Sequence, residues 1–324
     1  MSNSETATNI VTFHRTIPEC SAPQAATAQA ARIQHSAALG LLAACAAVTF
    51  MATYPAVTRL SVTATLTPAD LLFLRLGVSG LVFAPYLIWK AKDVPRSTWY
   101  VGIKLSFLHG WGMAGCVIFG LQFAPASHSA ALGPGAISAW IAAMNFLLYG
   151  VTIGRERIWA ISGIAFGVGL MLTGSFGGLS TANAVTGDVL FLAASALGAL
   201  YLTYMQHHKL DPVLGAALVS TYSAIILLPW YLLFAHSAFA AASIAEIAWQ
   251  IVFQGLLMGC VVSLAINYAV RAIGSQTVGM LCALVPVLGM LSSIAITSDP
   301  VLPREWAAIA AISLGVFFGA RPKR

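Results

Sequence analysis

The chain of 324 residues is 59% hydrophobic and has a net charge of +6. Only 8% of its residues are Asp, Glu, Lys or Arg, against about a quarter in soluble domains. A soluble fold of this size cannot bury so much apolar surface or cover itself with so few charges. The composition excludes a disordered chain, a coiled coil and a nucleic-acid-binding module. It predicts an all-α, polytopic membrane protein, in which the positive charge reports membrane topology.

Residues 1–35 are rich in Ala, Thr, Ser and Gln, which predicts a solvated, disordered tail. Ten apolar segments follow, each close to the roughly 20 residues that cross a bilayer. Their expected bounds are 36–58, 67–90, 98–122, 127–152, 157–176, 186–207, 211–235, 245–270, 275–297 and 303–321. With both termini inside, twelve Lys and Arg residues lie in cytoplasmic segments and two in outer ones. This bias predicts a plasma (inner) membrane protein with cytoplasmic N- and C-termini.

The sequence contains an internal repeat. Pro68–Pro85 and Pro212–Pro229 are each framed by two prolines, and Gly163–Gly167 matches Ala311–Gly315 at an offset of 148 residues. We therefore expect two five-helix domains, 36–177 and 184–321. Because five is odd, the second enters the membrane from the opposite side, and such inverted repeats are typical of transporters with a site near the midplane. The small residues of the second match should let helices pack closely, either between the halves or in a homodimer.

Several motifs carry a family resemblance. They are Arg75, Phe123–Leu132, Gly154–Ile158, Ala272–Thr277 and Leu284–Val287. With ten spans in two halves, the chain resembles the EamA-type permeases of the drug/metabolite transporter superfamily.

The resemblance implies export or exchange of small polar metabolites, such as amino acids, by alternating access. It also implies a central cavity lined by the first, third, fourth, sixth, eighth and ninth helices. Two features depart from the family pattern. Ser298–Pro300 replaces the usual Gly-Glu turn, and the first half lacks a proline that matches Pro286.

Polar and aromatic side chains on these helices are candidates for a substrate site. They are Trp111, Trp140, Asn145, Tyr201, Gln254 and Asn267. An aromatic floor with amide donors would suit a zwitterion with an apolar side chain. The alternative is that the aromatic residues form the belts found at membrane interfaces.

Two ionisable residues inside the apolar segments are functional candidates, because a charge in hydrocarbon is costly. Arg75 could hold a substrate carboxylate, or it could tie its helix to neighbouring carbonyls. His109 lies near the midplane among glycines, where it could bind substrate, couple transport to protons or bond to a neighbouring helix. No Asp or Glu is expected at mid-depth, so facilitated exchange is the simpler mechanism.

Two helices contain residues that break helical backbone. Gly133, Pro134 and Gly135 lie in the segment 127–152, and Pro286 lies in 275–297. Proline frees a carbonyl, and a freed backbone group at depth must face protein or a cavity. We therefore expect interruptions that serve as gates, with plain packing kinks as the alternative.

An intramembrane enzyme or a channel is the alternative function. The sequence has no HExxH or CxxC motif, and the adjacent His128 and Ser129 would not face one another on a helix. The five cysteines are scattered, so we expect no disulfide, no metal and no cofactor. A channel would need a charged pore ring, which the apolar segments do not offer. The expected partners are a small-molecule metabolite and the lipid bilayer.

Overall fold

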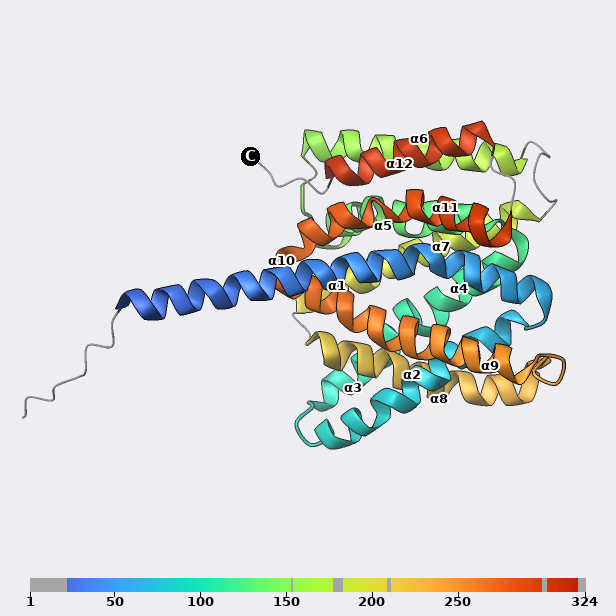
Figure 1. The fold of residues 1–324 in the computed structure, drawn as a ribbon, viewed down its shortest axis with the longest axis horizontal. Helices are drawn as coiled ribbons and strands as arrows, with labels where there is room; N and C mark the ends of the chain where they lie inside the picture. Colours follow the sequence, from blue (N-terminus) through green and yellow to red (C-terminus); the bar gives the residue numbers. More distant parts are fainter. Residues whose placement is uncertain (1–21, 153, 177–182, 209–210, 299–301, 320–324) are drawn as a thin grey trace, which may run out of the picture.

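The computed structural model describes residues 22–152, 154–176, 183–208, 211–298 and 302–319. These residues form a bundle of antiparallel helices and contain no strand (Figure 1). The first seven α-helices are α1 (Ala22–Ala64), α2 (Pro68–Lys90), α3 (Arg96–Leu105), α4 (Trp111–Phe123), α5 (Ala126–Tyr149), α6 (Arg155–Phe176) and α7 (Ala184–His208). The others are α8 (Pro212–Phe234), α9 (Ile244–Gln250), α10 (Ser263–Cys282), α11 (Val285–Thr297) and α12 (Pro303–Gly319). Two π-helical segments, η1 (Ser106–Gly110) and η2 (Ile251–Val262), join α3 to α4 and α9 to α10.

Nine stretches of the described chain are long and apolar enough to cross a membrane. The third, Arg96–Phe123, contains α3, η1 and α4, and the eighth, Ile244–Ile273, contains α9, η2 and the start of α10. The helix α12 has 17 described residues and supplies the tenth element of the bundle. The predicted fold class, an all-α polytopic membrane protein with two inverted five-helix repeats, is confirmed.

Some bounds differ from those that the sequence predicts. The helix α1 begins at Ala22, so the last part of the predicted disordered tail is helical, and it extends beyond the bundle (Figure 1). Residues 1–21 lie outside the described part. We call the end of the bundle where α1 enters and α12 finishes the near end. The opposite end, where α1 finishes at Ala64 and α12 begins at Pro303, is the far end.

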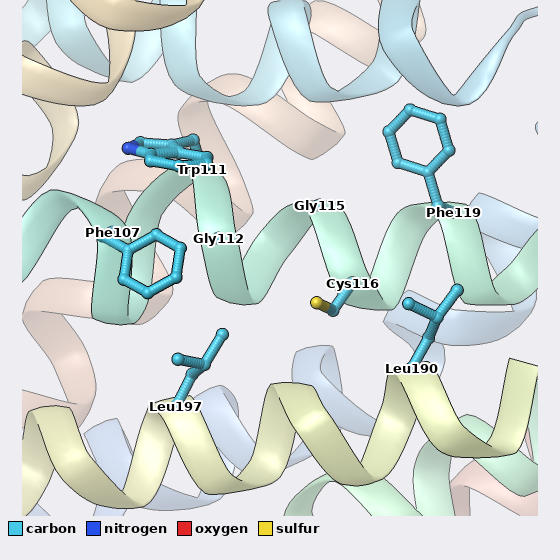
Figure 2. A pocket seen from close by; sticks show the side chains of 8 residues that line it. All are labelled: Phe107, Trp111, Gly112, Gly115, Cys116, Phe119, Leu190 and Leu197. Carbon is cyan, nitrogen blue, oxygen red and sulfur yellow. The ribbon is translucent and has the colours of Figure 1, made fainter.

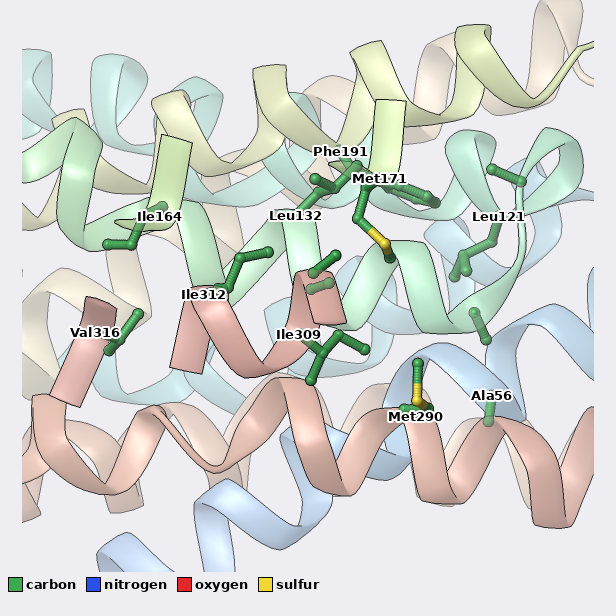
Figure 3. Packing of buried hydrophobic residues seen from close by; sticks show 14 of the residues in the cluster. Ala56, Leu121, Leu132, Ile164, Met171, Phe191, Met290, Ile309, Ile312 and Val316 are labelled. Atoms are coloured by element: carbon green, nitrogen blue, oxygen red, sulfur yellow. The ribbon is translucent and has the colours of Figure 1, made fainter. Parts of the chain in front are cut away.

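Helices of both halves share one apolar core. Leu132 of α5, Ile164 of α6 and Phe191 of α7 pack in the same cluster as Met290 of α11 and Ile312 of α12 (Figure 3). All of these side chains are almost fully buried. The two halves therefore fold against one another rather than as separate bundles.

The small residues of α6 and α12 face one another. A Cβ atom added to Gly167 would lie 2.6 Å from the carbonyl oxygen of Ala308, and one added to Gly315 would lie 2.7 Å from that of Ala160. Glycine at both positions lets the two backbones approach closely. The matched small-residue motifs thus join the two halves, and a homodimer stays a prediction.

Replacing Gly167 by Ala should destabilise this packing. The new methyl group would meet backbone rather than a flexible side chain, so we expect a loss of about 1–3 kcal/mol. The matched control is Gly169→Ala in the same helix, where an added Cβ meets nothing within 4 Å. Thermal unfolding in detergent should show a lower midpoint for the first variant only. Equal midpoints for the two variants would contradict the close contact.

Candidate functional site

The two π-helical segments occupy corresponding places in the repeat. The repeat offset of 148 residues carries Ser106–Gly110 onto residues 254–258, which lie within η2. Each segment packs against the second helix of the other half. An added Cβ on Gly110 would overlap Ser223 of α8, and one on Gly259 would lie 2.8 Å from the Cβ of Ser79 in α2. Because π-helical turns are rare and often mark functional sites, the third and eighth spans are the first places to search.

A cation and an aromatic ring meet beside the first of these spans. The guanidinium carbon of Arg75 in α2 lies 4.8 Å from the ring centre of Tyr54 in α1. Trp111, the first residue of α4, packs against the apolar cluster that contains Tyr54. The Tyr54 hydroxyl and the Trp111 indole nitrogen are both buried without a hydrogen-bond partner in the described structure.

His109 belongs to the same region. Its ring stacks on Tyr201 of α7, with the ring centres 4.2 Å apart and the planes at 12°. Its Nδ1 atom is buried without a hydrogen-bond partner among the described residues. The positive charge of Arg75 in α2 is near enough to interact electrostatically with the His109 ring. His109 therefore connects the first half to α7 of the second.

Gln254 contributes a polar side chain from η2. Its amide nitrogen donates a hydrogen bond to the Thr58 hydroxyl of α1 over 2.9 Å, while its amide oxygen is buried and unpartnered in the described structure. Tyr54, Trp111 and Gln254 lie ten to twelve residues from the far ends of their spans. At 1.5 Å per residue this is about 15–18 Å, near the middle of a bilayer core of about 30 Å.

We call Tyr54, Arg75, His109, Trp111 and Gln254 the mid-depth polar group. A buried polar atom without a partner costs about 1–3 kcal/mol. Four such atoms, from four different residues, leave hydrogen-bonding capacity that a solute or water would satisfy.

A shallow apolar cavity of about 300 Å³, wide open on one side, adjoins this group between α4 and α7 (Figure 2). Leu190 and Leu197 point into it from α7, and Phe107 and Cys116 approach from the opposite wall. Trp111 also lines it and thus belongs to both the cavity and the polar group. The remaining lining residues are Gly112, Gly115 and Phe119. The volume lies at the small end of the range for ligand pockets, and the lining suits an apolar moiety.

The other predicted site residues lie elsewhere. The Asn145 amide donates to the carbonyl of Ile141 within α5 over 2.9 Å. Trp140 and Asn267 are half-buried on α5 and α10, and they are not among the residues that line this cavity. A substrate role for these three residues stays a prediction.

The predicted helix breaks have different outcomes. The helix α5 continues through Pro134, so the interruption that we predicted there is not present. A proline inside a helix removes one backbone hydrogen bond, and here that loss does not end the helix. Gly133 has open space around it, and a Cβ on Gly135 would lie 3.6 Å from the Cγ of Pro286. In the other half, the backbone does break beside Pro286, since α10 ends at Cys282 and α11 begins at Val285. A gating role for all four residues stays a prediction.

Sequence reasoning missed a ladder of hydrogen bonds between the two halves at the far end. Gln254 donates to Thr58, Gln250 donates to Ser61 over 2.6 Å, and the Thr65 hydroxyl donates to Glu246. The signal was present in the spacing. Residues 58, 61 and 65 share one face of α1, and residues 246, 250 and 254 share one face of the eighth span. We call these three contacts the far-end ladder.

Asp70 forms a second far-end contact. It accepts hydrogen bonds from the backbone N–H and the hydroxyl of Thr67, which completes a capping box at the start of α2. It also accepts from the Tyr231 hydroxyl of α8 and from the Ala238 N–H over 3.0 Å. This buried carboxylate therefore ties the first half to the second.

A third far-end contact joins the starts of three helices. The Nδ1 atom of His128 (α5) lies 2.7 Å from an oxygen of Asp188 (α7), and its Nε2 atom lies 3.5 Å from an oxygen of Glu305 (α12). All three side chains are buried. The sequence placed both carboxylates at helix ends, but it could not show that these ends meet around His128.

The Asp70 contact can be measured by a double-mutant cycle with Tyr231. Asp70→Asn and Tyr231→Phe should each lower the unfolding midpoint in detergent, and the double variant should lose less than their sum. Coupling of about 0.5–3 kcal/mol is expected for residues in contact. The control is Asp211→Asn at the start of α8. Because asparagine also caps a helix, the unfolding midpoint of this variant should equal that of the unmodified protein. Additive losses would show that the two side chains do not interact.

Comparisons with known proteins bear on these observations. A family model described as "EamA-like transporter family" matches residues 38–173 and again 185–320. Both ranges fall within the halves that the internal repeat defines. A solved structure described as "Crystal structure of protein" aligns with a TM-score of 0.60 and 16% identity, covering 88% of this chain and 96% of that one. That likeness shows the fold alone. No curated protein matches the chain.

Proposed function

The chain belongs to the EamA-like transporter family, as the resemblance in its sequence predicted, and we propose that it is a secondary transporter of small polar metabolites such as amino acids. Export or exchange by alternating access is the proposed mode of action. The observation that carries the proposal is the mid-depth polar group, whose members come from both halves and keep buried polar atoms unpaired.

The chemistry of this group favours a solute with a carboxylate and an apolar part. Arg75 offers a planar fork of N–H donors that matches a carboxylate, and its guanidinium lies over the Tyr54 ring. The Tyr54 hydroxyl, the Trp111 N–H and the Gln254 carbonyl can satisfy further polar atoms of the solute. The apolar cavity beside Trp111 would take the side chain.

The far-end ladder supports alternating access. It consists of side-chain hydrogen bonds between α1 of the first half and α9 and η2 of the second. Inverted repeats can exchange two near-equivalent packings, so the contact that closes one end in one state has its counterpart at the other end in the second state. With cytoplasmic termini, the near end would face the cytoplasm and the far end the outside.

His109 was the sequence-based candidate for proton coupling. In the structure its ring stacks on that of Tyr201, a contact that an uncharged imidazole can make. We therefore propose that His109 binds solute or orients Tyr201 as a neutral imidazole, and that exchange through this site is facilitated.

A counterflow experiment tests the proposal. Purified protein in liposomes, loaded with a metabolite extract, should take up labelled amino acids above the level of empty liposomes. Arg75→Gln should lower the exchange of carboxylate solutes at least tenfold, because it removes a charge-assisted contact worth about 1.5–3 kcal/mol. The exchange rate of Arg75→Lys should lie between those of the unmodified protein and Arg75→Gln, since lysine keeps the charge but not the fork of donors.

The matched control is Arg155→Gln, which removes an exposed arginine at the start of α6. Its exchange rate should equal that of the unmodified protein. Wild-type rates in Arg75→Gln would contradict the proposed carboxylate site. A well-folded protein that exchanges none of the loaded metabolites would contradict the transport proposal.

A further inference from the structure

His128 stands between two buried carboxylates that belong to the other half. It lies on α5 of the first half, whereas Asp188 and Glu305 lie on α7 and α12 of the second. The exposed fraction is 2% for the His128 side chain, 0% for Asp188 and 8% for Glu305. The cluster is part of neither the mid-depth polar group nor the far-end ladder.

The hydrogen-bond geometry requires a proton. A neutral imidazole carries one N–H, whereas an imidazolium carries two. Both ring nitrogens of His128 face carboxylate oxygens, at 2.7 Å and 3.5 Å, so the two hydrogen bonds together need one proton more than a neutral ring and two carboxylates hold. The second oxygen of Glu305 is buried without a hydrogen-bond partner among the described residues, which adds a further place for a proton.

Among the described residues, the charged neighbours of the cluster come from two elements, α12 and α1. Arg304 precedes Glu305 on α12, and its Nε atom is buried. Arg59 of α1 donates to the carbonyl oxygens of Leu121 and Ala124, where α4 ends against the start of α7. The helices α4 and α11 carry no charged residue, and the charged residues of α6 lie at its near end. Loss of the proton from His128 would therefore remove a hydrogen bond that joins the two halves in a poorly hydrated place.

We propose that His128, Asp188 and Glu305 form a proton-binding site that holds the far end closed. With the proton bound, the imidazolium bridges the two halves through two charge-assisted contacts. When the proton leaves to water, one of the two charge-assisted contacts is lost, so the halves separate at the far end and the side chains become hydrated. Rising pH thus shifts the protein toward a state that is open at this end.

The inference rests on the proposed alternation of closure between the two ends, but its test needs no transported solute. Ser129, next to His128 and 3% exposed, is replaced by Cys in a chain whose five native cysteines are changed to Ala. The protein in lipid nanodiscs is then labelled with a charged maleimide from pH 5.5 to 8.5. A second chain with a single cysteine at exposed Thr152 corrects for the pH dependence of thiol reactivity.

The corrected labelling at residue 129 should rise about tenfold or more with pH, the shift expected when a charge-assisted hydrogen bond is lost. His128→Gln and Glu305→Gln should abolish the pH response, because neither can form the bridging ion pair. Asp211→Asn, an exposed carboxylate at the near end, should keep it. A variant that does not fold, as shown by size-exclusion chromatography, is replaced by Asp188→Asn.

Labelling that is absent at every pH, or that does not change with pH in the unmodified cluster, would overturn the proton site. So would a pH response that survives His128→Gln. Counterflow by the same preparation separates the two proposals. Counterflow together with pH-independent labelling supports the transport proposal and rejects the proton site. Labelling that depends on pH, in a protein without counterflow, supports the proton site and rejects the transport proposal.

Discussion

The cost of an unsatisfied polar group in a bilayer governs this structure. No water is available in the hydrocarbon region, so each buried polar atom must find a partner within the protein or within a cavity. At the far end, contacts between the halves supply partners for many of these atoms, in the far-end ladder, at Asp70 and around His128. At mid-depth, atoms of Tyr54, His109, Trp111 and Gln254 have no hydrogen-bond partner among the described residues. Closure and solute binding thus follow from one constraint, applied at two depths.

The two kinds of site are physically linked through shared residues. Gln254 donates to Thr58 in the ladder, and its amide oxygen belongs to the mid-depth polar group. It also lies in η2, where the π-helical backbone differs from that of the flanking helices. A solute that bonds to Gln254 would therefore act directly on the contact that closes the far end. In this account, the solute and Thr58 compete for the side-chain amide of Gln254, and this competition links solute binding to opening of the far end.

Features that depend on periodicity and composition could be predicted from the sequence. Contacts that depend on which helices are neighbours mostly could not. Apolar length placed the spans, and the matched prolines and small residues revealed the repeat. Arg59 shows the limit. It counted as an outer loop charge, yet its guanidinium caps the end of α4 by donating to Leu121 and Ala124. His128 seemed unremarkable beside Ser129, because its partners lie 60 and 177 residues away. The π-helical turns and the unbroken α5 have no counterpart in the hydrophobic periodicity of the sequence.

Distances measured at both ends of the molecule test the central claim, that the halves exchange closure, most directly. Spin labels at exposed Thr63 (α1) and Ile244 (α9) report the far end, and labels at exposed Tyr100 (α3) and Leu202 (α7) report the corresponding helices at the near end. Pulsed electron paramagnetic resonance in nanodiscs would compare protein with and without a solute found by counterflow. Alternating access predicts that one distance shortens as the other lengthens. Two distances that move in the same sense, or that both ignore the solute, would contradict it.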